Sequence, residues 1–205
     1  MKYTFEKREN KDTVQVALAS RKKTRLIERD GKLIIELGVG NVKEVTGRKL
    51  VVLARLIIKV AKENNVRRIA ITLSDFSFPK IKKLDDTELC SILAQNFEMA
   101  NFEFNRFKKE PKEGWREVEE IIAVGASRDC QKGFKKGQII GDGINRCREL
   151  ANTPGGEMTP TLLAKEAESA AKGTEVSVLV FSKKKLEELK MGAILGVSKG
   201  SVEEP

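Results

Sequence analysis

Apolar and polar residues alternate in the first part of the chain and later recur with the period of a helix. Val14, Val16 and Leu18 alternate with polar or small residues, and residues 33–37 form a second short apolar run, so two strands are predicted. Apolar residues between positions 47 and 64 cover most of a helical surface, which predicts a helix covered on two sides. Further strands are predicted at 67–73 and 121–125, and further helices at 85–101 and 129–152. Strands and helices that take turns in this way predict an α/β architecture.

The pattern changes after Asn152. Residues 152–160 are rich in turn-forming types, and Thr159 followed by Pro160 is typical of an N-cap and the first position of a helix, here predicted to reach about residue 172. A strand, a short helix and a second strand are predicted next, at 175–181, 183–190 and 193–198. This β-α-β has no further strands to complete its sheet, so both strands are expected to pair with another chain or to fray.

Composition excludes one kind of chemistry. The 205 residues include no histidine, which rules out Ser-His-Asp and Cys-His catalytic pairs and an HExxH zinc helix. Acid–base or metal chemistry in this chain therefore has to use carboxylates, lysines, backbone groups or bound ions. The net charge of +9 is unevenly divided: residues 1–150 carry +10 and residues 151–205 carry −1. A basic first part favours acidic partners.

Cysteine usage and hydropathy point to a cytosolic protein. Cys90, Cys130 and Cys147 are odd in number and have no CxxC spacing, so they are expected to be reduced thiols rather than a disulfide framework or a zinc knuckle. The N-terminus has no apolar signal segment. The longest apolar stretch is interrupted by Arg55 and Lys59, so no membrane span is expected.

Two glycine pairs resemble phosphate-binding loops only in part. Residues 38–40 (Gly-Val-Gly) follow a predicted strand, and residues 141–143 (Gly-Asp-Gly) lie in a predicted helix. The third glycine position of GxGxxG is Lys43 in the first pair and Arg146 in the second, and the chain has no GxxxxGK[ST] motif. The favoured interpretation is a turn after a strand for the first pair and a close helix contact for the second.

Basic clusters raise the question of nucleic-acid binding. They lie at 21–25, 80–83, 106–112 and 132–136. Nucleic-acid modules usually combine such charge with exposed aromatic residues or a recognition helix, and the chain has no RNP, KH or zinc-finger signature. The aromatic group near the third cluster is interpreted as core packing; its members are Phe97, Phe102, Phe104 and Phe107. A solvated basic surface is favoured, and nucleic-acid binding stays open as an alternative.

Carboxylates are dense in three places but do not predict a metal site. The groups are Asp85-Asp86, Glu117 with Glu119 and Glu120, and Glu203-Glu204. A two-metal site needs several acids that converge from different elements. These acids instead lie at a helix start, on the solvent face of a strand and near the end of the sequence, so helix caps and solvated surfaces are expected.

One run of residues resembles a known family. Residues 148–160 read R-E-L-A-N-T-P-G-G-E-M-T-P and resemble the R-x-L-x-N-T-P-x-N-x-x-T-P run of the leucyl (cytosol) aminopeptidase family. Residues 191–201 are similar to its M-G-x-x-x-x-V-x-x-G-S segment, and residues 203–205 fit the acidic-proline continuation. Residues 102–108 resemble a Y-x-F-x-x-Y-K element of its N-terminal domain. The chain departs from the family at Gly156, where the run has its second Asn.

The resemblance implies a fold and an activity for the parent protein. It implies a macro-domain-like α/β sandwich at 1–128, a linker helix at 129–152 and the truncated start of a catalytic peptidase domain at 153–205. It also implies a cytoplasmic hexamer, a metalloprotease that removes N-terminal residues from peptides. Two divalent metals, Zn²⁺ or Mn²⁺, would be held by Lys, Asp and Glu side chains, without histidine.

The family's catalytic and metal-binding segments have no counterpart in this sequence. The G-K-G-x-x-x-D-x-G-G and N-T-D-A-E-G-R runs of the family lie C-terminal to the position that matches Pro205. No catalytic, cofactor-binding or metal residue is therefore expected in this chain, and the chain alone is expected to be inactive. The alternative is that the basic first part is a nucleic-acid or partner-binding module. A third reading, ADP-ribose recognition by analogy with macro domains, rests on fold similarity alone.

Overall fold

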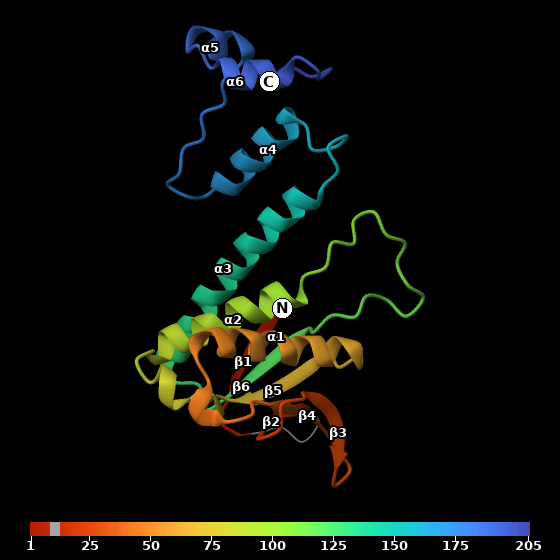
Figure 1. The fold of residues 1–205 in the computed structure, drawn as a ribbon, viewed down its shortest axis with the longest axis vertical. Helices are drawn as coiled ribbons and strands as arrows, with labels where there is room; N and C mark the ends of the chain where they lie inside the picture. The colour runs from red at the N-terminus through yellow and green to blue at the C-terminus, as the bar shows by residue number, and fades with distance from the viewer. Residues whose placement is uncertain (9–12) are drawn as a thin grey trace. The chain divides into compact units, whose positions relative to one another are not determined.

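The structure is a computed structural model that describes residues 1–8 and 13–205. The chain divides into two compact units, Met1–Arg146 and Cys147–Pro205 (Figure 1). The first unit contains a six-stranded sheet with the order β1-β6-β5-β2-β4-β3. Its strands are β1 Lys2–Glu6, β2 Val14–Ala19, β3 Arg25–Arg29, β4 Lys32–Gly38, β5 Arg68–Thr72 and β6 Glu120–Val124. Only β3 runs antiparallel to its neighbour, so the predicted α/β class is confirmed.

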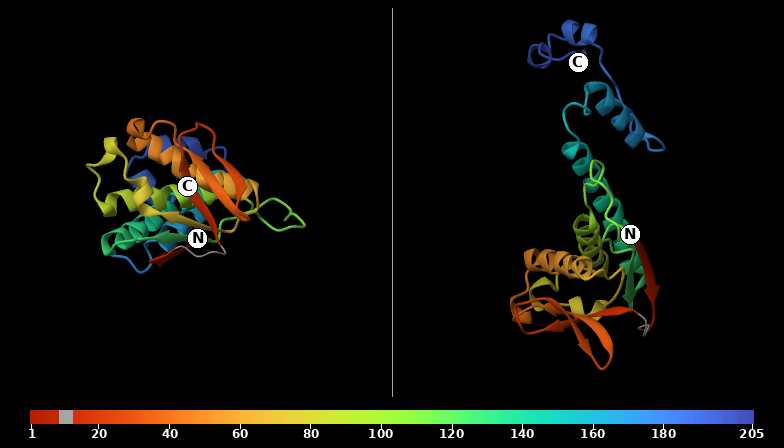
Figure 2. Two further views of the ribbon diagram at one scale, coloured as in Figure 1. Left: turned by 90° about the horizontal axis from the view of Figure 1, so that it is seen from below. Right: turned by 90° about the vertical axis from the view of Figure 1, so that its right-hand side faces the viewer.

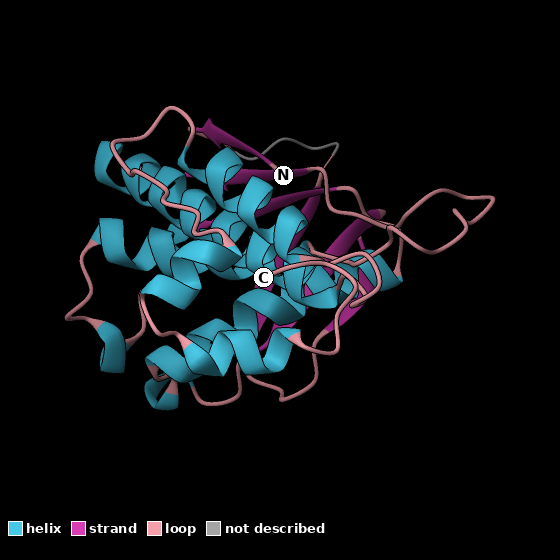
Figure 3. Ribbon diagram, turned by 90° about the horizontal axis from the view of Figure 1, so that it is seen from above, coloured by secondary structure: helices cyan, strands magenta, loops and turns pink. Residues whose placement is uncertain are grey.

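Helices cover one face of this sheet. They are α1 Gly47–Glu63, α2 Asp86–Asn101 and the beginning of α3 Arg128–Asn152, with short 3-10 turns η1 Val42–Glu44, η2 Leu73–Phe76 and η3 Pro79–Ile81. Side chains at alternate strand positions, such as Ile35, Ile69 and Ile121, are fully buried against α1 and α2. Those two helices pack side by side over the sheet (Figures 2 and 3).

Local signals in the sequence set where these helices begin and end. The side chain of Thr46 accepts a hydrogen bond from the Lys49 amide at the start of α1. Asp85 and Glu88 form a capping box at the start of α2, as the run of acids there predicts. Asn64 caps the end of α1, and its side-chain amide donates to the Val60 carbonyl at 2.8 Å.

Three glycines explain how α3 lies against α2. Gly133, Gly137 and Gly141 recur every four residues and therefore share one face of the helix. A Cβ atom added at Gly137 would overlap the carbonyl oxygen of Ser91, and one added at Gly141 would lie 2.6 Å from the Cβ of Glu98. The absence of side chains lets the two backbones approach closely, which confirms the helix-contact interpretation for Gly141 of the second glycine pair but not for Gly143, which has open space at its Cβ position.

The second unit is helical where it has regular structure. It contains α4 Pro160–Ala171, α5 Lys183–Glu188 and α6 Gly192–Ser198. The predicted start of α4 is confirmed, because the Thr159 hydroxyl accepts from the Leu162 amide at 3.3 Å. The two predicted strands are wrong: residues 175–181 form no ladder, and residues 193–198 are helical.

The missing strands have a physical reason. A strand needs the N–H and C=O groups of a neighbouring strand, and the second unit, all of which the structure describes, contains none. Residues 193–198 satisfy their backbone groups locally in a helix instead. Val176 and Leu179 remain 67% and 79% exposed in the extended segment. Among the described residues, no helix is long and apolar enough to cross a membrane.

Candidate functional site

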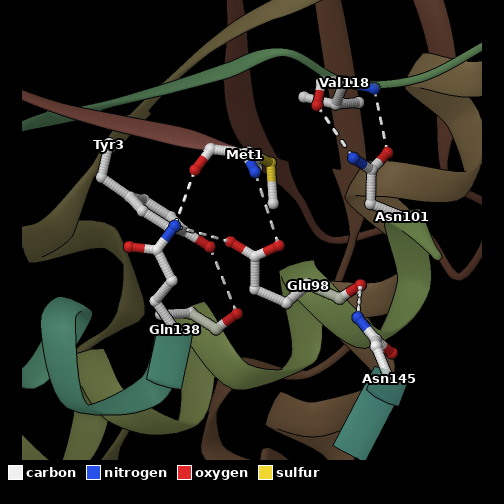
Figure 4. Close-up of polar contacts among 8 residues, drawn as sticks. Met1, Tyr3, Glu98, Asn101, Val118, Gln138 and Asn145 are labelled. Atoms are coloured by element: carbon white, nitrogen blue, oxygen red, sulfur yellow. Dashed lines mark hydrogen bonds and ion pairs between the residues drawn. The ribbon is translucent and has the colours of Figure 1, made fainter. Parts of the chain in front are cut away.

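The sheet edge, α2 and α3 meet at a buried carboxylate, that of Glu98 (Figure 4). Glu98 is only 5% exposed, and its Oε2 lies 3.7 Å from the amino nitrogen of Met1. The Gln138 side-chain amide donates both to the Met1 carbonyl at 2.7 Å and to Glu98 Oε1 at 3.3 Å. The Asn145 amide donates to the Glu98 backbone carbonyl at 3.0 Å. These contacts tie β1, α2 and α3 together.

Burial dominates the electrostatics of this cluster. It raises the pKa of Glu98, and the Met1 ammonium and the Tyr3 hydroxyl oppose that effect. Burial also raises the pKa of Tyr3 above its ordinary value, and the neighbouring Glu98 charge adds to the rise. Tyr3 therefore keeps its proton, which it donates to the Ala94 carbonyl at 3.3 Å. The cluster therefore holds β1, α2 and α3 together, and the buried Glu98 carboxylate is paired with the Met1 ammonium.

A disulfide joins Cys90 of α2 to Cys130 in the first turn of α3, with 5.4 Å between the Cα atoms. The expectation of three reduced thiols is therefore wrong for two of them, and Cys147 is free and exposed. Local spacing could not reveal the pair, since the two residues are separated by 40 positions in sequence. The close approach at Gly133 brings them together: a Cβ added at Gly133 would lie 3.0 Å from the Cβ of Cys90.

A cavity of about 450 Å³ lies at the carboxyl ends of β5 and β6. This is the end of a parallel sheet at which ligands commonly bind. Ser127, one of its lining residues, donates a hydrogen bond to Asp86 at 2.7 Å and accepts one from the Cys130 amide at 3.1 Å. These lining groups are thus occupied in capping α3, and Cys130 places the disulfide beside the cavity.

The carboxylates noted in the sequence do not converge. Asp85 accepts from the Glu88 amide at 2.8 Å, as a helix cap. Glu119 pairs with Arg67, Glu203 accepts from Thr161, and Glu204 pairs with Lys183. Within residues 1–8 and 13–205, no group of three Cys, Asp or Glu side chains is placed to hold a metal ion. In the part of the chain that the structure describes, the carboxylates noted in the sequence therefore do not assemble into a dinuclear site.

Glu120 differs from its neighbours because it is buried rather than on the solvent face of its strand. Its carboxylate accepts from the Thr4 hydroxyl at 2.5 Å and pairs with Lys2 at 3.1 Å and Arg68 at 2.7 Å. The Thr4 hydrogen bond and these two cations lower the pKa of Glu120 to about 2. Strands β1, β6 and β5 are thus joined by one carboxylate on the sheet face opposite α1 and α2.

Replacing Glu120 with glutamine is expected to lower the free energy of unfolding at pH 7 by about 1–3 kcal/mol. The folded-state pKa is depressed, so the stabilisation is present above about pH 4.5 and is lost as the pH falls towards 2. Urea unfolding measured from pH 7 to pH 2 should show a shallower acid limb for Glu120→Gln. Glu117→Gln, at an exposed position, is the matched control. Equal acid limbs in both variants would contradict the assignment.

Carboxylate partners are present for some cations of the basic clusters, namely Arg21, Arg25, Lys80 and Lys132. Arg21, Arg25 and Arg29 all point to Glu36, at 3.2, 3.1 and 3.8 Å, and that carboxylate is buried. No local pattern indicated that Glu36 is buried, since its partners lie on other segments. Lys80 pairs with Glu44 at 2.5 Å. Such pairing favours the solvated-surface interpretation of these clusters.

The aromatic residues near the third basic cluster divide into two kinds. Phe97 is fully buried, as expected of a core residue. Phe107 is 49% exposed, so core packing is the wrong interpretation for it. Its ring lies 5.7 Å from that of Phe104, with the Arg106 guanidinium 5.4 Å from its centroid.

The family-like segments lie at the end of α3 and in the second unit. Residues 148–160 run from the last turn of α3 to the start of α4, and Thr153 is buried with its hydroxyl donating to the Glu149 carbonyl at 2.9 Å. Residues 191–201 include α6. Gly156 has open space at its Cβ position, so the departure from the family run there is not forced by crowding.

Two family models match this chain in the expected order. The N-terminal domain of the cytosol aminopeptidase family matches residues 19–111, and its catalytic domain matches residues 145–205. A probable cytosol aminopeptidase of Bdellovibrio bacteriovorus is 31% identical over 84% of this chain and 34% of its own length. Leucine aminopeptidase A1, chloroplastic, of Solanum lycopersicum is 31% identical over 71% of this chain and 25% of its own length. The chain belongs to the cytosol aminopeptidase family.

Solved structures show the same fold. A mutant of tomato leucine aminopeptidase matches with a TM-score of 0.83 and 20% identity, over all of this chain and 49% of that one. The bottromycin maturation enzyme BotP, solved in complex with Mn, matches with a TM-score of 0.76 and 15% identity, over 95% of this chain and 44% of that one. The chain thus spans about a third of the Bdellovibrio relative and less than half of these structures.

Proposed function

We propose that this chain is the N-terminal portion of a metal-dependent aminopeptidase that removes N-terminal residues from peptides. The observation that carries the proposal is the ordered match of two domains of one family to residues 19–111 and 145–205. On this proposal, residues 1–128 form the N-terminal domain, residues 129–152 the linker helix and residues 153–205 the start of the catalytic domain. The whole enzyme is cytoplasmic on this proposal, in keeping with relatives named cytosol aminopeptidases, and the family resemblance implies a hexamer.

Two divalent metals, zinc or manganese, belong to the proposed whole enzyme. When bound, such a pair polarises the substrate carbonyl and activates a water. BotP, a structural neighbour, was solved with Mn. In the described part of this chain no three Cys, Asp or Glu side chains are grouped to hold a metal ion, and on this proposal its residues act by building the scaffold. The disulfide, the three glycines and the Glu98 cluster fix the first half of α3 against the N-terminal domain.

The alternative of a nucleic-acid-binding module has weaker support. Arg21, Arg25 and Arg29 share Glu36, and Arg68 and Lys2 share Glu120. Pairing of this kind reduces the positive field that phosphate binding needs. A steep loss of DNA affinity between low and physiological salt, together with measurable sequence preference, would nevertheless support that alternative.

The 205-residue chain is expected to release no leucine from leucyl p-nitroanilide, with or without added Mn²⁺ or Zn²⁺. The protein encoded by the full reading frame should hydrolyse the same substrate and lose that activity when a chelator is added. Absorbance of released nitroaniline measures both. Metal-dependent turnover by the 205-residue chain would show that catalytic residues lie within it. A metal-loaded full-length protein without turnover would remove the proposed function.

A further inference from the structure

Strand β1 is an edge of the sheet with unused backbone groups. In its parallel pairing with β6, the Lys2 amide donates to the Glu119 carbonyl at 2.8 Å, and the Glu6 carbonyl accepts from the Gly125 amide at 3.0 Å. Both backbone groups of a strand residue point to the same side, and successive residues alternate. The N–H and C=O groups of Tyr3 and Phe5 therefore point away from β6, where the described residues supply no further strand.

A groove of about 720 Å³ runs beside this edge, between β1 and the first turns of α3. Its apolar surface comes from Tyr3 and Phe5, whose rings lie 5.1 Å and 5.7 Å from the ring of the fully buried Phe134. Phe5 is 36% exposed, at the open side of the groove. The groove thus combines unpaired backbone groups with an apolar surface for alternate side chains of an added strand.

The charges that line the groove are all positive. They come from Lys2, Arg128, Lys132 and Lys135, and no carboxylate lines it. Lys2 and Lys132 also pair with Glu120 and Asp129 outside the groove lining. Arg128 and Lys135, both exposed, have no ion-pair partner among the described residues.

The opposite edge of the sheet is built differently. Strand β3 carries Arg25, Glu28 and Arg29, and its hairpin to β4 closes through Asp30 and Gly31, both with positive φ. Charged side chains of this kind protect an edge strand against further pairing. Strand β1 has charged residues only at its ends, Lys2 and Glu6, and the uncharged residues Tyr3, Thr4 and Phe5 at its centre.

We propose that the β1 edge and this groove bind an extended acidic segment of another protein, which adds to the sheet as a further strand. Its backbone would pair with Tyr3 and Phe5, its apolar side chains would contact the exposed part of the Phe5 ring, and its carboxylates would face Arg128 and Lys135. A second copy of this chain fits less well. Antiparallel pairing of two β1 strands would set Lys2 opposite Glu6, but it would also bring the α3 cations of both copies together.

The test uses the 205-residue chain and a fluorescein-labelled eight-residue peptide of alternating Val and Glu. Fluorescence anisotropy should show saturable binding that weakens about tenfold in Arg128→Glu/Lys135→Glu and falls with added salt. The matched control Lys108→Glu/Lys112→Glu makes the same charge change at two exposed loop positions and should bind like the wild type. Amide NMR shifts should centre on Tyr3 and Phe5. A peptide with alternate amides N-methylated should not bind.

Three outcomes would overturn the proposal. The first is no saturable binding at millimolar peptide, and the second is equal binding of a Val/Lys peptide or of the N-methylated peptide. The third is a chain dimer that analytical ultracentrifugation detects and that Tyr3 and Phe5 amide shifts locate at β1, which would assign the edge to a second copy. None of these measurements depends on peptidase activity, so failure here leaves the proposed function untouched.

Discussion

Replacing Gly137 with alanine is expected to lower the free energy of unfolding by about 2–4 kcal/mol, although alanine is the better helix former. The added methyl group would overlap the carbonyl oxygen of Ser91 and lie 2.8 Å from the Cβ of Ala94. Neither neighbour is the flexible end of a long side chain, so α2 and α3 would have to move apart. That movement would loosen the contacts of fully buried residues on both helices, such as Phe97 and Phe134.

Gly143 is the matched control on the same helix. Nothing lies within 4 Å of its Cβ position, so Gly143→Ala should gain about 0.5–1 kcal/mol from helix propensity and from a less flexible unfolded chain. Urea unfolding followed by far-UV circular dichroism gives both values. If Gly137→Ala unfolds at the same urea concentration as the wild type, or a higher one, α2 and α3 do not approach as the structure shows.

The glycine pattern shows what the sequence reveals and what it does not. A close helix contact was predicted at residues 141–143 because the phosphate-loop fingerprint was incomplete there. The partner helix and the part played by Gly133 and Gly137 were not predicted, since one sequence does not show which helix the glycine face meets. The same three positions lower helix propensity, yet α3 is continuous because packing against α2 outweighs that cost.

Predictions from local patterns succeeded where the stabilising partners are also local. The capping box at Asp85 and the N-cap at Thr159 need only neighbouring residues, and both are present. The strands predicted at 175–181 and 193–198 needed partner strands, which the second unit lacks. Apolar runs of this length fit a strand or a helix equally well until their surroundings are known.

The functional residues follow the same rule: those in a contiguous motif could be predicted, and those defined by contacts between elements could not. Family membership was predicted from a contiguous run at 148–160, which a single sequence displays directly. Buried Glu36, Glu98 and Glu120 were not singled out as buried centres, because their partners come from other strands and helices, near Glu36 in sequence but far from Glu98 and Glu120. Tyr3, for example, lies 95 positions before the carboxylate that helps to raise its pKa. Buried interactions of this kind form only when the chain folds, and the composition shows only how many charged residues the chain has.

Reduction of the disulfide between Cys90 and Cys130 is expected to lower the free energy of unfolding by about 3–4 kcal/mol. The bond closes a loop of 40 residues, and breaking it returns that conformational entropy to the unfolded chain. For a chain of this length the loss corresponds to a fall in Tm of roughly 10 °C. Calorimetry with and without dithiothreitol measures it. The Cys90→Ala/Cys130→Ala variant should have the Tm of the reduced protein both with and without dithiothreitol. The Tm of Cys147→Ala should fall on reduction as much as that of the wild type.

Thiol counting and a mutant cycle test whether the bond and the glycine contact act together. In unfolded, unreduced protein, alkylation should modify Cys147 alone, and three modified cysteines would show that no disulfide had formed. Gly133 and Gly137 lie on adjacent turns of α3, and the disulfide holds this end of α3 against α2. With the bond intact, the helices cannot separate easily to accept a methyl group. Gly137→Ala should therefore cost less free energy in the reduced protein than in the oxidised one, and equal costs would mean that the bond and the contact are independent.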